Sequence, residues 1–132
     1  MPVRHNAGGA ANLERMLSFF DDTICAPATV PGTGAIAIVR LSGPDAMGVA
    51  GRVVSVSGKP LGETDGYRLR FGTVLDHDGN VLDEVLVSVF RSPHSYTGED
   101  SVEISCHSSR YIVSSLLALL EAAGARLAMP GE

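Results

Sequence analysis

Two charged side chains stand alone in apolar segments, and their types make them the first candidates for chemistry. Arg40 is the only charge in the run Ala35–Ser42, and Glu103 lies between Val102 and Ile104. An isolated charge is costly to bury, so each group needs a partner. An edge position, or a salt bridge between the two residues, accounts for both charges without any ligand. The alternative is a ligand that offers complementary donors and acceptors.

A second candidate is the neighbouring pair Cys106 and His107, whose residue types suggest a thiolate–imidazole pair. Neighbours on one strand point to opposite faces of a sheet, so we expect these side chains to diverge. We interpret Cys106 as a buried structural cysteine and His107 as a residue at a strand end. His94, Ser95 and Asp100 match a hydrolase triad by residue type alone, and nothing in their arrangement along the chain sets the geometry of a triad.

Two glycine-containing segments do not fit phosphate-binding motifs. A dinucleotide-binding loop follows a strand and opens a helix, whereas the run after Gly32-Thr33-Gly34 has the pattern of a strand. Gly58-Lys59 is followed by proline, and position 53 is valine, so this segment is not a phosphate loop. The chain is therefore not expected to hydrolyse nucleotides by such a loop.

Composition and charge exclude several classes of protein. With 132 residues, of which 45% are apolar and 19% charged, the chain is typical of one globular domain. Two cysteines predict neither a disulfide framework nor a structural zinc site. Ten basic and fifteen acidic residues give a net charge of −5, which argues against independent tight binding to nucleic acid. The sequence shows no membrane-spanning run and no secretory signal in its first residues, so we expect a cytoplasmic protein.

Hydrophobic periodicity predicts the elements that position the candidate residues. Residues 1–20 are predicted to form a flexible N-terminal arm, and residues 21–132 one folded domain. A helix is expected to begin near Ser42-Gly43-Pro44 and end near Val54, and a second one to span Ser109–Ala123 and end at Gly124. Apolar or alternating runs predict strands at residues 23–29, 35–41, 67–75, 81–90, 101–106 and 125–129.

The order of these elements predicts the fold class. The polar segment 55–66 is expected to be a connection, and Asp76-His77-Asp78-Gly79-Asn80 a hairpin turn. Pro27 indicates an edge position or an early end for the first strand. We therefore expect an α+β fold, in which a mixed, mostly antiparallel sheet carries both main helices on one face.

Several longer strings of residues resemble one known family. On these residues, the chain from about Asp21 to Glu132 resembles the N-terminal domain of the tRNA modification GTPase MnmE family. The strings are Asp22-Thr23-Ile24, the run from Val30 to Pro44, Asp83-Glu84, Pro93-His94-Ser95-Tyr96-Thr97-Gly98-Glu99-Asp100, Val102-Glu103-Ile104, Cys106-His107, and the run from Ala123 to Glu132.

The resemblance implies a ligand and two site residues. It implies a domain similar to the folate-binding domains of aminomethyltransferases, which binds 5-formyltetrahydrofolate or 5,10-methylenetetrahydrofolate as a one-carbon donor and forms a homodimer. Arg40 and Glu103 match the folate-binding positions of the family; no catalytic or metal-binding residue carries over. A carboxylate such as Glu103 can accept the paired N–H donors of a pterin edge, and Arg40 can hold the carbonyl or carboxylate groups of a folate.

The family also implies partners that this chain does not itself contain. In the family the chain continues beyond Glu132 with a helical domain and a GTPase domain, which uses GTP, potassium and magnesium. The whole protein acts with the flavoprotein MnmG on the wobble uridine of tRNA. We therefore expect a fragment or isolated domain that has no GTPase activity and lacks the complete modification activity.

Three positions depart from the pattern of the family. Thr33 stands where the family has arginine, and Ser108-Ser109 where it has two glycines. Glycine allows the backbone to approach a ligand closely, so two serines there predict a weaker or altered folate site. The alternative interpretation is therefore a dimerisation module whose folate site is vestigial.

Overall fold

The computed structural model describes residues 22–29, 34–64, 66, 68–92 and 99–129. The predicted arm at residues 1–20 lies outside the described residues. The strands are β1 (Ile24–Pro27), β2 (Ile36–Ser42), β3 (Val54–Val56), β4 (Arg68–Leu75), β5 (Val81–Phe90), β6 (Ser101–His107) and β7 (Arg126–Leu127). The helices are α2 (Ala46–Val53), α3 (Arg110–Ala122) and the short 3₁₀ helix η1 (Leu61–Glu63).

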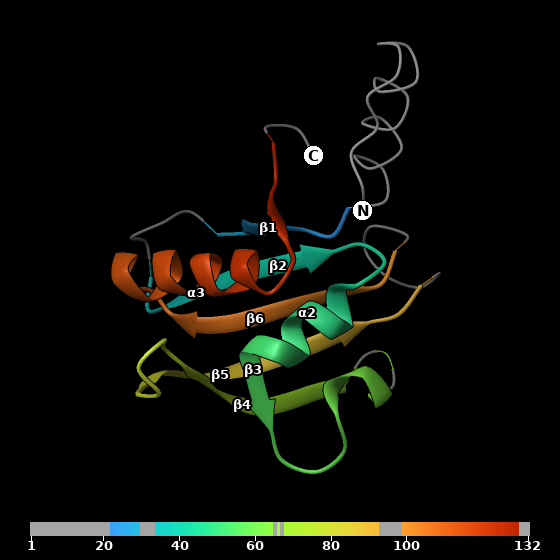
Figure 1. Ribbon diagram of the computed structural model, residues 1–132, viewed down its shortest axis with the longest axis horizontal. Coiled ribbons are helices and arrows are strands. Elements are labelled where there is room, and N and C mark those ends of the chain that lie inside the picture. The colour runs from blue at the N-terminus through green and yellow to red at the C-terminus, as the bar shows by residue number, and fades with distance from the viewer. Residues whose placement is uncertain (1–21, 30–33, 65, 67, 93–98, 130–132) are drawn as a thin grey trace, which may run out of the picture.

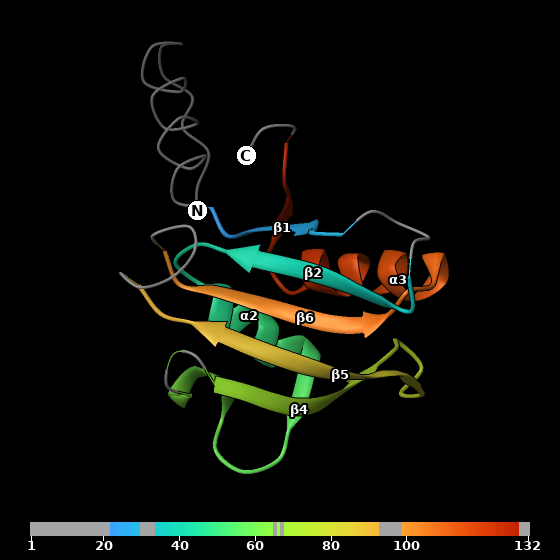
Figure 2. The ribbon, with the colours of Figure 1, turned by 180° about the vertical axis from the view of Figure 1, so that it is seen from behind.

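All the strands belong to one sheet, in the order β3-β4-β5-β6-β2-β1-β7. Among the described strands, β1 and β7 run parallel, and the other neighbouring pairs are antiparallel. Both α2 and α3 pack on the same face of the sheet, which is seen in front in Figure 1 and from behind in Figure 2. The predicted α+β fold, with a mixed sheet and two helices on one face, is confirmed.

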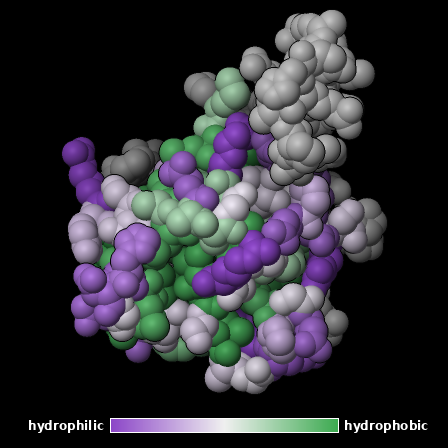
Figure 3. Space-filling view, viewed as in Figure 1, coloured by the Kyte–Doolittle hydropathy of each residue, from purple (hydrophilic) through white to green (hydrophobic). Residues whose placement is uncertain are grey.

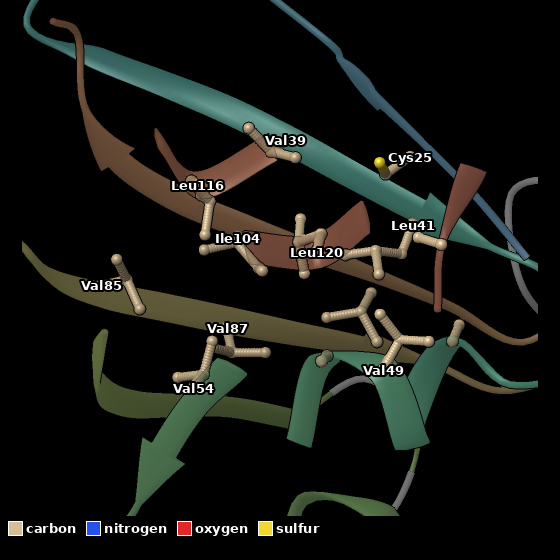
Figure 4. Packing of buried hydrophobic residues seen from close by; sticks show 14 of the residues in the cluster. Cys25, Val39, Leu41, Val49, Val54, Val85, Val87, Ile104, Leu116 and Leu120 are labelled. Carbon is tan, nitrogen blue, oxygen red and sulfur yellow. The ribbon is translucent and has the colours of Figure 1, made fainter. Parts of the chain in front are cut away.

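The hydrophobic core lies between the helices and the covered face of the sheet (Figure 4). Alternate residues of β5 and β6 point into it, and Val87 and Ile104 are fully buried. Leu116 and Leu120 of α3 and Val49 of α2 close the core from the helix side. Every second residue of these strands faces the helices. These side chains pack against the apolar stripes of the two helices and form one layer.

The chain differs from the predicted elements in a few places. The connection predicted at 55–66 contains β3, which pairs with β4, and also η1. The first helix begins later than expected, at Ala46, because Asp45 is its N-cap. The first strand ends at Pro27 as predicted, but it is not at an edge, since β7 pairs with its beginning.

The predicted hairpin turn is confirmed, and a serine cap fixes the start of α3. Ser109 is the N-cap of α3, and its side chain accepts a hydrogen bond from the backbone N–H of Ile112. The carboxylate of Asp76 accepts from the backbone N–H groups of Asp78 and Asn80, which closes the turn between β4 and β5. These hydrogen bonds satisfy backbone N–H groups that have no acceptor within a helix or between paired strands.

Candidate functional site

Arg40 and Glu103 lie directly opposite each other on the neighbouring strands β2 and β6. The guanidinium of Arg40 donates from Nε and Nη2 to the same oxygen of Glu103, Oε2, at 2.8 Å and 2.6 Å. Both side chains alternate with residues buried under the helices, so they belong to the uncovered face of the sheet, which we call the open face. Residues 63 positions apart in the sequence thus form one ion pair.

This geometry decides between the explanations for the two isolated charges. β2 and β6 are interior strands, so the edge position is wrong. The salt bridge is confirmed, and each charge has the other as its partner. The presence of these charges in apolar strands therefore does not by itself indicate a ligand. What remains available is the second carboxylate oxygen of Glu103, Oε1, to which no residue of the described chain donates a hydrogen bond.

The neighbours of the ion pair on the open face are small or apolar. Across the sheet, Ala26 of β1 lies beside Arg40, and Ser88 of β5 lies beside Glu103. The next row along the strands on this face is Ile38, Ser105 and Leu86. The surface beside the charged pair is therefore made mostly of small or apolar side chains.

A second polar cluster lies at the end of β6, where Asp83 holds His107. The carboxylate of Asp83 is 9% exposed, and it accepts from the backbone N–H of His107 and from Nδ1 of the ring, each at 2.8 Å. An ionised carboxylate only accepts, so Nδ1 of His107 is the donor in this contact. The ring is 70% exposed, whereas Cys106 is buried, so the predicted divergence of Cys106 and His107 is confirmed.

Asp83 does not stand out from the sequence as a site residue. The sequence does contain a signal that Asp83 is buried. Val85, Val87 and Val89 alternate along β5 and face the core, and Asp83 occupies the preceding position of the same alternation. Burial of a carboxylate requires donors, and the end of β6 supplies them.

The hydrolase triad has no support in the described residues. His94 and Ser95 lie outside them. Asp100 accepts from the backbone N–H of Ser92 at 2.8 Å and lies 3.5 Å from Nη1 of Arg91. The carboxylate of Asp100 therefore links the residue just before β6 to the residues that directly follow β5.

Two hollows lined by described residues lie on the helix side of the molecule. A cavity of about 220 Å³ at the N-terminus of α3 is lined by Ser108 and Ser109, over an apolar floor that includes Leu117. Ser109 stands where the family has glycine. Its side chain caps α3 and so strengthens the start of the helix. It also adds a side chain to the wall of this cavity.

A groove of about 540 Å³ lies by the C-terminal ends of α2 and α3, where hydrophobic surface is visible in Figure 3. Arg52 in this groove already donates to the carbonyl of Ala123. Neither hollow gathers groups for catalysis, and the described residues contain no cluster of three or more metal-binding side chains. No helix within the described ranges is long and apolar enough to span a membrane.

The chain is similar to proteins of one family along most of its length. A family model described as "GTP-binding protein TrmE N-terminus" matches residues 23–132. The tRNA modification GTPase MnmE of Bacteroides fragilis is 52% identical over 113 residues, which cover 84% of this chain and 24% of the relative. The protein of the same name from Moorella thermoacetica is 52% identical over 114 residues, covering 85% and 25%.

A third relative, the MnmE of Parabacteroides distasonis, is 46% identical over 112 residues, which cover 83% of this chain and 24% of the relative. The chain thus spans about a quarter of the length of the curated relatives it matches. On this similarity and on the fold described above, the chain belongs to the family of the N-terminal domain of MnmE.

Proposed function

We propose that this domain binds a one-carbon derivative of tetrahydrofolate and forms a homodimer, as part of a GTPase that modifies the wobble uridine of tRNA. The observation that carries the folate proposal is Oε1 of Glu103, which receives no donor from the described residues and lies on the open face, at one of the two positions that match the family's folate contacts. The proposed ligands are 5-formyltetrahydrofolate and 5,10-methylenetetrahydrofolate. When bound, such a folate supplies the one-carbon group.

The residues present fit this ligand chemically. The pyrimidine edge of a pterin has N–H donors on neighbouring atoms, and Glu103 has a carboxylate oxygen, Oε1, without a donor from the described residues. A folate also ends in carboxylates, which a guanidinium such as that of Arg40 binds in paired fashion. Ile38 and Leu86 provide apolar surface for the flat ring beside these charges.

Calorimetric titration of the chain with 5-formyltetrahydrofolate tests the folate proposal. We expect saturable heat with the parent chain and none with Glu103→Gln, because the amide presents an N–H group where the pterin needs an acceptor. Glu121→Gln, on the exposed side of α3, is the matched control and should bind as the parent does. Binding to Glu103→Gln with the affinity of the parent would show that the site lies elsewhere.

The dimerisation proposal rests on the part of the open face that adjoins the proposed folate site, with Leu86 at the border between them. Leu69 and Phe71 of β4 and Leu86 of β5 are 61%, 60% and 40% exposed, and they adjoin one another in the strand register. Clustered exposed apolar side chains mark interaction surfaces. Glu84 lies on the same face, opposite Thr73 at one end of this patch, so a charged group borders the apolar surface.

Sedimentation analysis tests this interface with matched variants. Phe71→Asp should convert the dimer into a monomer, because a carboxylate cannot be buried unpaired against a second copy. Tyr111→Asp, which is 68% exposed on α3, should leave the dimer intact. A parent chain that stays monomeric at high concentration would overturn the dimerisation proposal.

The runner-up function is a dimerisation module with a vestigial folate site. The ion pair that already gives Glu103 a charged partner, and the side chains of Ser108 and Ser109, favour it. A parent chain that dimerises but gives no heat with 5-formyltetrahydrofolate would select this function. In either case we propose that the domain acts in the cytoplasm, turns over no GTP by itself and leaves contact with tRNA and with the flavoprotein MnmG to the whole protein.

A further inference from the structure

The ion pair on the open face uses the carboxylate of Glu103 unevenly. Arg40 directs two N–H donors, Nε at 2.8 Å and Nη2 at 2.6 Å, to the single oxygen Oε2. Within the described chain, Oε1 receives no donor. The side chains of Arg40 and Glu103 are 34% and 21% exposed, so solvent and solutes reach the pair.

A guanidinium and the pyrimidine edge of a pterin present the same pattern to a carboxylate. Each carries N–H donors on two nitrogens that share one carbon atom, and each can face both oxygens of a carboxylate side by side. A pterin can make this paired contact only if Oε2 is released. In the ligand-free protein, Arg40 thus occupies the place on Glu103 that the pterin edge needs.

We propose that Arg40 is an internal competitor for Glu103, which turns away when a pterin-type ligand binds and then selects ligands that carry an acidic tail. This inference rests on the proposed folate function and adds a second role for Arg40. The guanidinium leaves one carboxylate, that of Glu103, and gains another, that of the ligand. Arg40 thereby favours folates over pterins that lack the glutamate.

The surroundings of Arg40 allow such a movement. An ion pair that is partly exposed is weak, because water and ions screen both charges. The side chains beside the pair on the two neighbouring strands are small: Ala26 next to Arg40, and Ser88 next to Glu103. Arginine also has a long, flexible stem, so its head can shift while its backbone stays in the β2 ladder.

Binding of two probes to three arginine variants tests the proposal. The probes are 5-formyltetrahydrofolate and 5-formyl-6-methyltetrahydropterin, which has the same ring system without the acidic tail. Arg40→Gln should bind the tail-free probe between about 1.4-fold and fivefold more tightly than the parent, the range set by the net strength of an exposed ion pair. The preference for the folate over the tail-free probe should fall about tenfold or more, because a charge-assisted bond is lost.

Two further variants separate competition from other effects. Arg40→Lys keeps the charge but not the paired donors, so it should bind the tail-free probe better than the parent while keeping part of the preference for the folate. Arg68→Gln, an exposed arginine of the same sheet, should change neither affinity. Circular dichroism of each variant verifies that it is folded.

Each result decides for or against the proposal. If Arg40→Gln weakens both probes equally, Arg40 holds Glu103 in place rather than competing for it, and this inference fails while the folate function stands. An unchanged preference for the folate would also overturn it. If neither probe binds to the parent chain, the folate function itself is wrong, and this inference falls with it.

Discussion

Along β6, Ile104 is fully buried under the helices, whereas its neighbour Glu103 lies on the open face in contact with Arg40. The same contrast recurs on β5, where Val87 is fully buried and Leu86 is 40% exposed. One set of strands therefore serves two purposes. The covered face is close-packed and determines the fold, while the open face holds side chains that the fold does not need and that are therefore available for ligands and partners.

The largest expected difference between the faces is in stability. Ile104→Ala should lower the free energy of unfolding by about 2–5 kcal/mol, because it leaves a cavity in the core. Ile36→Ala, on the neighbouring strand β2 but 56% exposed on the open face, should lower it by less than about 1 kcal/mol. Urea unfolding of both variants measures this. Similar losses would mean that the open face is packed against something in the free chain.

Cysteine reactivity offers a second comparison, because Cys25 and Cys106 both point into the covered face. Burial, assisted by Glu121 at Cys25 and by Asp83 at Cys106, raises the pKa of both thiols to about 11. Since the thiolate is the reactive form, labelling at pH 8 should be about a hundredfold slower in the folded chain than in urea, and it should accelerate as the pH rises. Equal rates in the two states would contradict this burial.

The end of β6 allows the role of a buried carboxylate to be separated from that of its exposed partner. Asp83→Ala should lower the free energy of unfolding by about 1–3 kcal/mol, because the backbone N–H of His107 loses its acceptor. His107→Gln keeps that N–H and should lose less than about 1 kcal/mol. Thermal unfolding of both variants measures the difference. Equal losses would show that the exposed ring, and not the backbone bond, accounts for the contribution of Asp83.

The smallest effect on stability is expected at the ion pair. Arg40→Gln should change the free energy of unfolding by no more than about 1 kcal/mol, because the pair is partly exposed to solvent. The same urea titration measures it. A loss as large as that of Ile104→Ala would mean that Arg40 and Glu103 are part of the structural core and not of a binding surface.

Most of the fold could be predicted from the sequence because local patterns and tertiary packing agree. The alternation in β5 and β6 and the hairpin residues at Asp76 each specify their element within a few residues. β3 was missed because it has only three residues, Val54–Val56, and directly follows α2. Its pairing with β4 makes it a strand, and such a contact leaves no local signal.

The candidate site was predictable only in part. Arg40 and Glu103 stood out because charges are rare in buried strands, but their pairing depends on the register of β2 with β6. Sequence alone left a salt bridge and a ligand as alternatives, and the structure confirms the salt bridge. That a folate also binds there stays a prediction, drawn from the family and from the chemistry of the carboxylate. Asp83 was missed because its role depends on the place where β6 ends.

The most direct test of the account is a methyl nuclear magnetic resonance titration with 5-formyltetrahydrofolate. Ile38 and Leu86 lie beside the ion pair on the open face, and Ile104 and Leu120 lie in the core beneath the helices. We predict that the methyl signals of Ile38 and Leu86 shift in a saturable way while those of Ile104 and Leu120 stay nearly constant. Shifts confined to residues of the helix layer, with Ile38 and Leu86 unchanged, would contradict the assignment of the folate site to the open face.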